Sequence, residues 1–191
     1  MEGVLPVFHH RWSPRSFADR EVDPALLSKV FEAARWAASC YNEQPWRFFV
    51  GMRNSNTYKK IFDSLSEANQ AWARTAPVLM VGATHAKFSR NGVPNRVALY
   101  DLGAAASYLT LQAAALGLAT HQMAGFNLET TRRALAIPED YIMGTAIALG
   151  YQGEPAALAS EALLRSETAP RTRKPLSEIV LSEWGQAAKL S

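Results

Sequence analysis

The sequence is poor in cysteine, and this alone excludes several kinds of site. Cys40 is the single cysteine among 191 residues, so no disulfide can form within the chain and no pair of thiols can bind zinc. Such cysteine usage is typical of a reducing compartment. The first ten residues also lack the charged start and apolar core of a signal peptide, and we therefore expect a cytoplasmic protein.

Several short nucleotide and metal motifs are missing as well. The eleven glycines contain no GxGxxG pattern, which argues against a Rossmann-type dinucleotide site. The P-loop pattern GxxxxGK[ST] and the zinc motif HExxH are also absent. The four histidines show no ligand spacing beyond the adjacent pair His9 and His10. We therefore expect surface or supporting histidines and no bound metal.

Charge and long apolar runs are scarce. The formal net charge is only +3, and arginines gather near both ends of the chain. Such a modest excess marks a small-anion site more often than a nucleic-acid track, so no nucleic-acid partner is expected. The one membrane-like run, Val97 to Leu118, is rich in Ala, Gly, Ser and Thr and contains Asp101. It is better interpreted as a buried helix than as a membrane span.

Helix and strand patterns follow one another without regular alternation. Helices are predicted over 23–38, after 54–56, over 96–118 and over 129–136, and strands over 47–52, 77–83, 122–126 and 141–151. The first helix begins with Asp23 as N-cap and Pro24 in its first turn. Residues 68–72 break the second helical pattern, and 88–95 should be an exposed loop or lid.

This succession indicates an α+β fold with a helix-covered sheet. A length of 191 residues predicts one domain, 1–191, in which 156–191 is a C-terminal extension. The extension carries apolar residues but little core of its own. It must therefore pack on something, and a partner subunit is the natural candidate.

Two short basic segments are candidates for binding an anion. One runs from Arg11 through Ser13 to Arg15, and the other contains Arg171 and Arg173. A guanidinium offers two parallel donors to phosphate, and a serine hydroxyl adds a third. Taken alone, each segment would more often be an ordinary solvated stretch, but the two could converge on one phosphate.

The segment from Ala38 to Phe48 joins a helical pattern to a strand pattern. Hydroxyl, amide, proline and aromatic residues make it a stiff, hydrogen-bonding corner of the kind that holds a ligand. Cys40 within it could be a nucleophile in principle. Because no histidine and asparagine accompany it in a recognisable pattern, a small residue in a tight loop is the better interpretation.

Five blocks in order resemble the nitroreductase family of FMN-dependent NAD(P)H oxidoreductases. They are Arg11-x-Ser13-x-Arg15-x-Phe17, Ala38-Ser39-x-x-Asn42-x-Gln44-Pro45-Trp46-Arg47-Phe48, Asn69-Gln70 before Ala76-Pro77-Val78-Leu79, Met123-Ala124-Gly125-Phe126, and Arg171-x-Arg173-Lys174-Pro175-Leu176. The resemblance implies a nitroreductase-like fold with a mostly antiparallel or mixed sheet flanked by helices. It also implies a homodimer with one FMN per active site at the interface, and a C-terminal tail that packs on the partner subunit.

The resemblance assigns cofactor-binding roles at both ends of the chain. Arg11 and Ser13 match positions that bind the phosphate and ribityl chain of FMN, and Arg171 and Arg173 match a late basic pair that also reaches the phosphate. Trp12, included in this cofactor-binding set, stands where the family usually repeats arginine.

Other positions match contacts to the flavin ring. Arg15 matches a residue beside the polar edge of the ring, and Asn69 matches one near its pyrimidine part. Met123, Ala124 and Gly125 match a backbone segment that runs under the isoalloxazine and can donate an N–H towards N5. Ala124 replaces the acidic residue that some members carry there.

A further block matches a loop that contacts the flavin held mainly by the other subunit. Its residues are Ala38, Ser39, Cys40 and Asn42, and Ala38 stands where proline is frequent in the family.

The implied activity is hydride transfer from NADPH or NADH through flavin N5 to a small-molecule acceptor by a ping-pong mechanism. The acceptors would be nitroaromatics, quinones or enones. Arg15 is the candidate for stabilising the negative charge of the reduced flavin, and no other side chain is assigned a catalytic role. Two alternatives stay open: an FMN-dependent dehydrogenase or oxidase of a dedicated metabolite, and a non-catalytic flavin-binding module.

Overall fold

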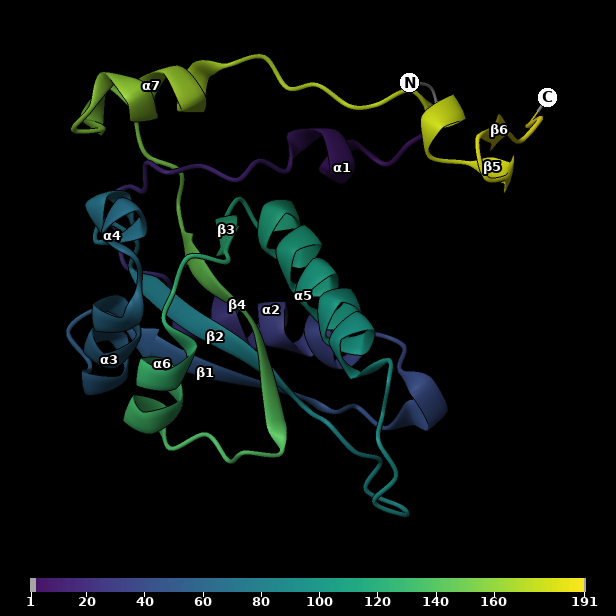
Figure 1. Cartoon of the computed structure of the whole chain (residues 1–191). Helices are drawn as coiled ribbons and strands as arrows, with labels where there is room; N and C mark the ends of the chain where they lie inside the picture. Colours follow the sequence, from purple (N-terminus) through teal and green to yellow (C-terminus); the bar gives the residue numbers. More distant parts are fainter. Residues whose placement is uncertain (1–2, 191) are drawn as a thin grey trace.

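The computed structural model describes residues 3–190 and contains an antiparallel sheet covered by helices on both faces (Figure 1). Four strands pair in the order β1-β2-β4-β3, and they are β1 (Trp46–Met52), β2 (Val78–His85), β3 (Ala119–Met123) and β4 (Tyr141–Gly150). Three of them lie within two residues of the predicted ranges. The strand predicted over 122–126 is instead β3, because the ladder with β4 begins at Ala119, opposite Gly150, and ends at Met123. The α+β fold class is confirmed.

The central strand β2 is apolar along its length because both of its faces are covered. Every residue from Val78 to Thr84 is buried. Its neighbours β1 and β4 pair with it on either side, and a register shift between Val81 and Ala83 marks a bulge. A continuous apolar run of this kind is the expected sequence pattern of a strand buried on both faces.

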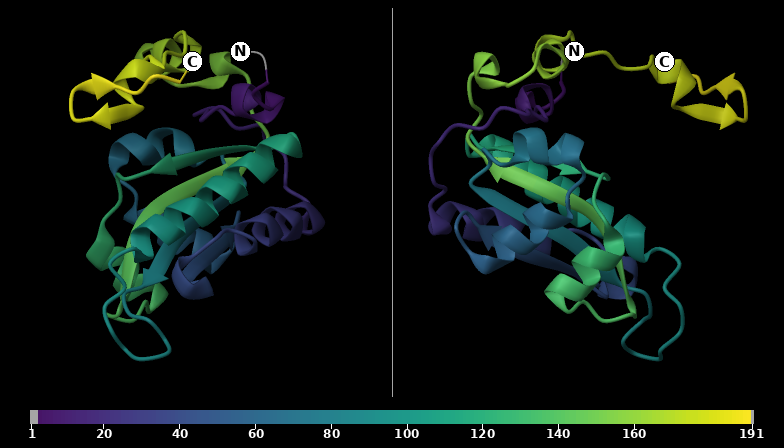
Figure 2. Two further views of the ribbon diagram at one scale, coloured as in Figure 1. Left: turned by 90° about the vertical axis from the view of Figure 1, so that its right-hand side faces the viewer. Right: turned by 60° about the vertical axis from the view of Figure 1, so that its left-hand side comes forward.

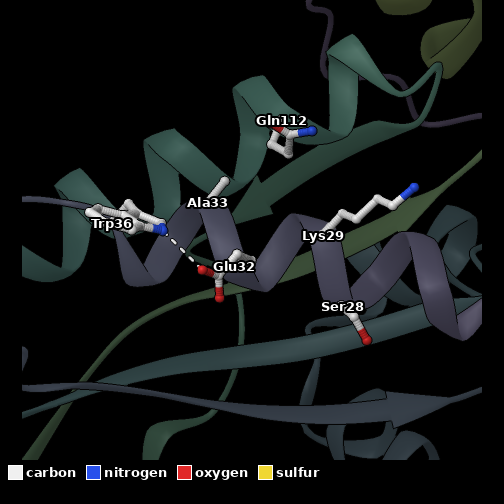
Figure 3. Close-up of a pocket in the computed structure, with 6 residues that line it drawn as sticks. All are labelled: Ser28, Lys29, Glu32, Ala33, Trp36 and Gln112. Carbon is white, nitrogen blue, oxygen red and sulfur yellow. Dashed lines mark hydrogen bonds between the residues drawn. The ribbon is translucent and has the colours of Figure 1, made fainter.

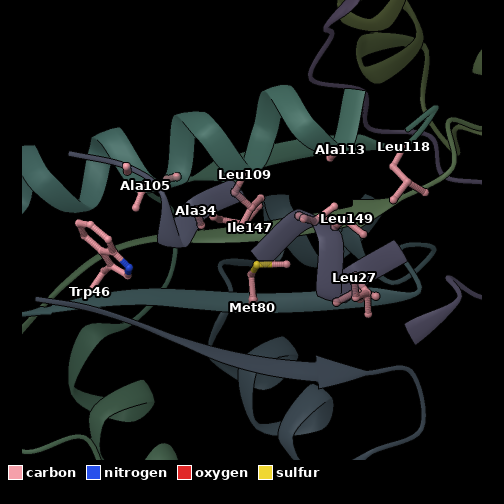
Figure 4. Close-up of a cluster of buried hydrophobic side chains, with 14 of the residues drawn as sticks. Leu27, Ala34, Trp46, Met80, Ala105, Leu109, Ala113, Leu118, Ile147 and Leu149 are labelled. Carbon is pink, nitrogen blue, oxygen red and sulfur yellow. The ribbon is translucent and has the colours of Figure 1, made fainter. Parts of the chain in front are cut away.

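One face of the sheet carries α2 (Pro24–Arg35) and α5 (Ala98–Ala115). The predicted start of α2 is confirmed, since the Asp23 carboxylate accepts a hydrogen bond from the Ala25 N–H at 2.8 Å. Figure 4 shows the core between these helices and the sheet, in which Leu109 and Ile147 are fully buried. The small residues of α5 let it lie close to its neighbours.

The long helix is shorter than the predicted 96–118. It ends at Ala115 because Gly117 takes a left-handed conformation with φ +74°. The N–H groups of Gly117 and Leu118 then donate to the carbonyls of Ala114 and Ala113, which is a Schellman arrangement. None of the helices formed within residues 3–190 combines the length and apolar character that a membrane span requires.

The opposite face carries α3 (Asn56–Ser64), α4 (Glu67–Ala73) and α6 (Leu128–Leu135). The helical pattern breaks at Leu65, before the predicted 68–72, and residues 68–72 are themselves helical and belong to α4. The chain restarts a helix there because Trp72 is buried against Phe17, within a cluster of buried apolar side chains on this face of the sheet. Local periodicity did not indicate this burial.

The two ends of the chain run side by side above the sheet. The short helix α1 (Pro6–His10) and the helix α7 (Glu161–Thr168) lie in these segments (Figure 1). Beyond α7 the chain forms a small hairpin of β5 (Leu181–Glu183) and β6 (Gln186–Ala187) that projects away from the body (Figure 2). Trp184 at its tip is 98% exposed.

Candidate functional site

Three arginines from opposite ends of the chain converge beside α1. The Arg11 guanidinium donates from Nη1 to the Ser13 hydroxyl at 3.0 Å. The Arg171 guanidinium donates from Nη1 to the Arg11 carbonyl at 2.6 Å and from Nη2 to the His9 carbonyl. The positive charge of Arg173 is one of the causes that lower the pKa of Arg11, after burial. The structure therefore brings Arg11, Ser13, Arg171 and Arg173 together, although about 160 residues separate the two segments.

This cluster gathers positive charge, because Arg171 and Arg173 both lower the stability of the charged form of Arg11. The pKa of Arg11 is lowered, first by burial and then by the positive charges of Arg173 and Arg171. Among residues 3–190, none of the three arginines forms an ion pair. The Arg171 guanidinium lies 5.4 Å from the centre of the Trp12 ring, so Trp12 steadies it by stacking. An anion would relieve the repulsion among the arginines.

Segment 13–15 is held in place by a buried carboxylate that was not predicted from the sequence. Glu167 of α7 is only 6% exposed, and its Oε2 accepts a hydrogen bond from the Arg15 N–H at 2.8 Å. The other oxygen, Oε1, is buried without a partner among the described residues. Nothing in the local sequence around Glu167 indicates that its side chain is buried.

His121 fixes the same segment from the other side. Its Nδ1 donates to the Pro14 carbonyl at 3.0 Å, and its ring centre lies 4.5 Å from that of Trp72 in α4. Burial lowers the pKa of His121, so the imidazole is neutral near pH 7. Through these contacts β3 and α4 lie directly against the basic N-terminal segment.

Asn69 and the segment after β3 form the neighbouring part of the site. The Asn69 amide donates to the Gly125 carbonyl at 2.9 Å. A side chain at Gly125 would place its Cβ 2.7 Å from Asn69 Nδ2 and 2.8 Å from Ser66 Oγ, so a larger residue would displace these two side chains. Met123 is buried and Ala124 is exposed. A pocket of about 540 Å³ opens beside Ser66, Ala124 and Gly125.

The loop after α2 is held in a strained conformation. It contains the single turn η1 (Cys40–Asn42), and Tyr41, Asn42 and Gln44 have φ of 54°, 57° and 49°. Left-handed backbone at non-glycine residues costs roughly 1 kcal/mol or more at each position, and such residues cluster at functional sites. The Ser39 hydroxyl accepts from the Gln44 N–H at 2.9 Å, which helps to maintain the turn.

The structure does not bring this loop to the arginine cluster within one chain. The Cys40 N–H donates to Asp101 in the first turn of α5 at 3.2 Å. The residues of α1 next to the arginines instead lie against the last turns of α5, near Leu111 and Ala115. Since α5 has 18 residues, it spans about 27 Å. Ala38, Ser39, Cys40 and Asn42 therefore lie at the far end of that helix from Arg11 (Figure 1).

A pocket of about 570 Å³ on the outer side of α2 and α5 contains none of the predicted site residues (Figure 3). Trp36 and Glu32 both line this pocket, and the Trp36 indole N–H donates to the Glu32 carboxylate at 2.9 Å. Hydrogen bonds from Arg35 and Trp36 lower the pKa of Glu32 to about 2. These polar groups satisfy one another, and the pocket is a shallow depression away from the arginine cluster.

Comparisons with known proteins agree on one family. The family model described as "Nitroreductase family" matches residues 9–71 and 62–151. A protein of Archaeoglobus fulgidus, with the provisional name NADH dehydrogenase/NAD(P)H nitroreductase, is 27% identical over 155 residues, which cover 79% of this chain and 86% of that protein.

Two solved structures extend the likeness to the fold. A protein described as an oxidoreductase containing FMN is 30% identical, with a TM-score of 0.90 over 97% of this chain and 94% of its own. A protein of Desulfovibrio desulfuricans in complex with FMN is 25% identical, with a TM-score of 0.76 over 96% and 98% of the two chains.

Proposed function

The chain belongs to the nitroreductase family, and from this premise we propose that it is an FMN-dependent oxidoreductase that uses NAD(P)H to reduce a small organic acceptor. Bound FMN would supply hydride-transfer chemistry in two half-reactions, with NADH or NADPH as the donor. The acceptor would be a nitroaromatic, a quinone or an enone. The convergence of three arginines without an acidic partner is the observation that carries this proposal.

The residues present fit FMN. A phosphate would accept hydrogen bonds from Arg11, Arg171 and Arg173 and from the Ser13 hydroxyl, and its charge would offset their mutual repulsion. Arg11 and Arg171 are already oriented by Ser13 and by the backbone of the N-terminal segment. Little side-chain freedom would be lost on binding.

Other residues would hold the ring. The Arg15 backbone is fixed by Glu167, so its half-buried guanidinium is available to stabilise negative charge on the reduced cofactor. Asn69 would contact the polar edge of the ring from its position against Gly125. The backbone of Met123, Ala124 and Gly125 would run beneath the ring, next to the pocket that opens there.

We further propose a homodimer in which each site is completed by the other subunit. Ser39, Asn42 and their neighbours lie about the length of α5 from the arginine cluster of their own chain, and a second copy could bring them to it. Large apolar side chains stay uncovered on α5 and on the C-terminal hairpin, where Tyr100 is 79% exposed and Trp184 98% exposed. In this arrangement 1–191 acts as one domain and the extension 156–191 packs on the partner subunit.

The purified protein should be yellow, and its flavin absorbance should be bleached by NADH or NADPH without oxygen. Adding an acceptor such as a nitroaromatic or a quinone should restore the absorbance in a second, separate phase. These two phases can be followed by stopped-flow spectroscopy. A colourless protein that binds no added FMN would contradict the proposal, and reduction without reoxidation by any acceptor would indicate a non-catalytic flavin module.

Arg11→Ala should weaken FMN binding about tenfold or more, because one charged donor to the phosphate is lost. Fluorescence titration of the apoprotein measures this change. Arg133→Ala on α6 is the matched control, since this exposed arginine lies outside the site. Unchanged FMN affinity in Arg11→Ala would show that the phosphate lies elsewhere.

A further inference from the structure

The segment 87–94 is an ordered hairpin-like loop. An isolated bridge joins Lys87 to Pro94, and the Phe88 N–H donates to the Val93 carbonyl at 2.9 Å. Gly92 has a φ of +70° and donates its N–H to the Phe88 carbonyl at 2.8 Å, which closes the turn. The side chains at the tip of this loop therefore have defined positions.

This loop rests on the strained loop 38–44. The Ser89 N–H donates to the Glu43 carboxylate at 2.6 Å. The rings of Phe88 and Tyr41 meet edge to face, with their centres 5.8 Å apart. Tyr41 nevertheless stays 70% exposed, so one side of this aromatic pair faces outwards. The two loops together form one surface at the N-terminal end of α5.

Arg90 lies with its guanidinium over the rings of that surface. The carbon of its guanidinium lies 4.0 Å from the centre of the Tyr41 ring and 5.6 Å from that of Phe88. The side chain is exposed, and no ion pair involving it is present in the part of the chain that the structure describes. A stacked guanidinium presents the N–H groups at its edge to a ligand while its face stays covered.

The carboxylate of Glu43, in the neighbouring loop, is already engaged by a hydrogen bond. The pKa of Glu43 is lowered mainly by its hydrogen bonds with Ser89 and only secondarily by His85 and Arg90. Glu43 therefore serves to fix the position of the loop, and the donors of Arg90 remain available to another anion.

We propose that Arg90 binds an anionic group of a substrate at the entrance to the active site. This inference rests on the proposed function, in which loop 38–44 lies against the cofactor held by the other subunit. The ligand chemistry is a carboxylate or phosphate, which matches the two parallel donors of a guanidinium. Two substrates could carry this anionic group: an acceptor with a carboxylate, or the nicotinamide donor with its phosphates. Stacking on Tyr41 orients the guanidinium in advance, which reduces the entropy lost on binding.

Paired substrates, one with an anionic group and one without, test the proposal on the FMN-loaded enzyme. The donors are NADH and 1-benzyl-1,4-dihydronicotinamide, which has no phosphate, and the acceptors are 4-nitrobenzoate and neutral 4-nitrobenzamide. Arg90→Gln removes the positive charge. Arg90→Lys keeps the charge but lacks the planar pair of N–H donors that a guanidinium offers. Arg96→Gln is the control, because Arg96 is an exposed arginine close to the same loop and stacks on none of the rings in the described part of the chain.

Arg90→Gln should lower the second-order rate constant for the anionic member of one pair about tenfold or more, as expected for a lost hydrogen bond to a charged group. The neutral member should change less than about twofold, and Arg90→Lys should fall between. The pair that responds identifies the source of the anion. Arg96→Gln should behave as wild type.

Equal effects of Arg90→Gln on both members of each pair, or no effect on any, would overturn the proposal. Thermal denaturation and FMN content of each variant show whether the fold and the cofactor are retained. If the wild-type protein itself shows no reduction of bound flavin, the proposed function fails. A wild-type enzyme that turns over without any charge-dependent effect of Arg90 overturns only this inference.

Discussion

At the scale of single residues, one buried carboxylate joins the two ends of the chain. Glu167 accepts a hydrogen bond from the Arg15 N–H, and it precedes Arg171 by only four residues. The hydrogen bond between Glu167 and Arg15 therefore lies next to the place where Arg171 meets Arg11. A buried acceptor that loses its partner, or a donor that loses its acceptor, is costly, so this junction should be sensitive to change.

Glu167→Ala should raise the dissociation constant of FMN about tenfold, because the arginines would no longer be held together. Riboflavin, which lacks the phosphate, should be bound with little change. Glu167→Gln retains an acceptor oxygen for the Arg15 N–H and should restore most of the affinity. Fluorescence titrations with the two flavins provide the comparison. Equal losses for FMN and riboflavin would mean that Glu167 supports the fold in general and does not position the phosphate site.

At the scale of the element, the loop after α2 depends on contacts from distant segments. Its left-handed residues Tyr41, Asn42 and Gln44 are unfavourable by themselves. The Cys40 N–H is anchored to Asp101 of α5, which is only 3% exposed. The surrounding structure therefore maintains a conformation that the loop would not adopt alone.

Asp101→Ala should destabilise the protein by about 1 to 3 kcal/mol, because the Cys40 N–H loses a charged acceptor. Asp101→Asn keeps an oxygen in the same place and should cost clearly less. Urea unfolding of the apoprotein, followed by circular dichroism, measures both changes. An unaltered unfolding midpoint in Asp101→Ala would show that the loop is held by its other contacts.

At the scale of the whole molecule, the outer side of α5 is more apolar than a solvated helix requires. Leu99, Tyr100 and Tyr108 are exposed there, and Gly103 lies among them, where an added Cβ would meet no atom of another element within 4 Å. Glycine inside a helix costs about 1 kcal/mol relative to alanine, and no contact within residues 3–190 supplies a packing reason for it. Close approach of a second subunit would supply that reason.

Gly103→Arg should leave the secondary structure intact but convert the protein to a monomer with weak FMN binding. The bulky, charged side chain would block the proposed interface, and each site would lose the partner's loop 38–44. Analytical ultracentrifugation and flavin titration test this. Glu129→Arg on α6, across the sheet from α5, is the control and should stay dimeric. A Gly103→Arg variant that remains a dimer with full FMN content would place the interface elsewhere.

The sequence alone was informative where short-range chemistry decides the outcome. The Asp23 cap and the apolar run of β2 predicted their elements correctly, because capping and two-sided burial leave local patterns. The restart of the chain at α4 was not predicted, since it depends on burial of Trp72 against Phe17 far away in sequence. The end of α5 lies three residues before the predicted 118, because the left-handed Gly117 closes the last turn early.

The five ordered blocks determined the family and, through it, the expected cofactor. Only the tertiary structure showed that Arg171 donates to the Arg11 carbonyl, that Glu167 is buried beneath Arg15, and that Arg90 stacks on Tyr41. The physical reason is that these contacts join segments far apart in the chain. Local propensity does not encode which distant segments meet, because that is decided by the path of the chain and by the packing of the sheet and its helices.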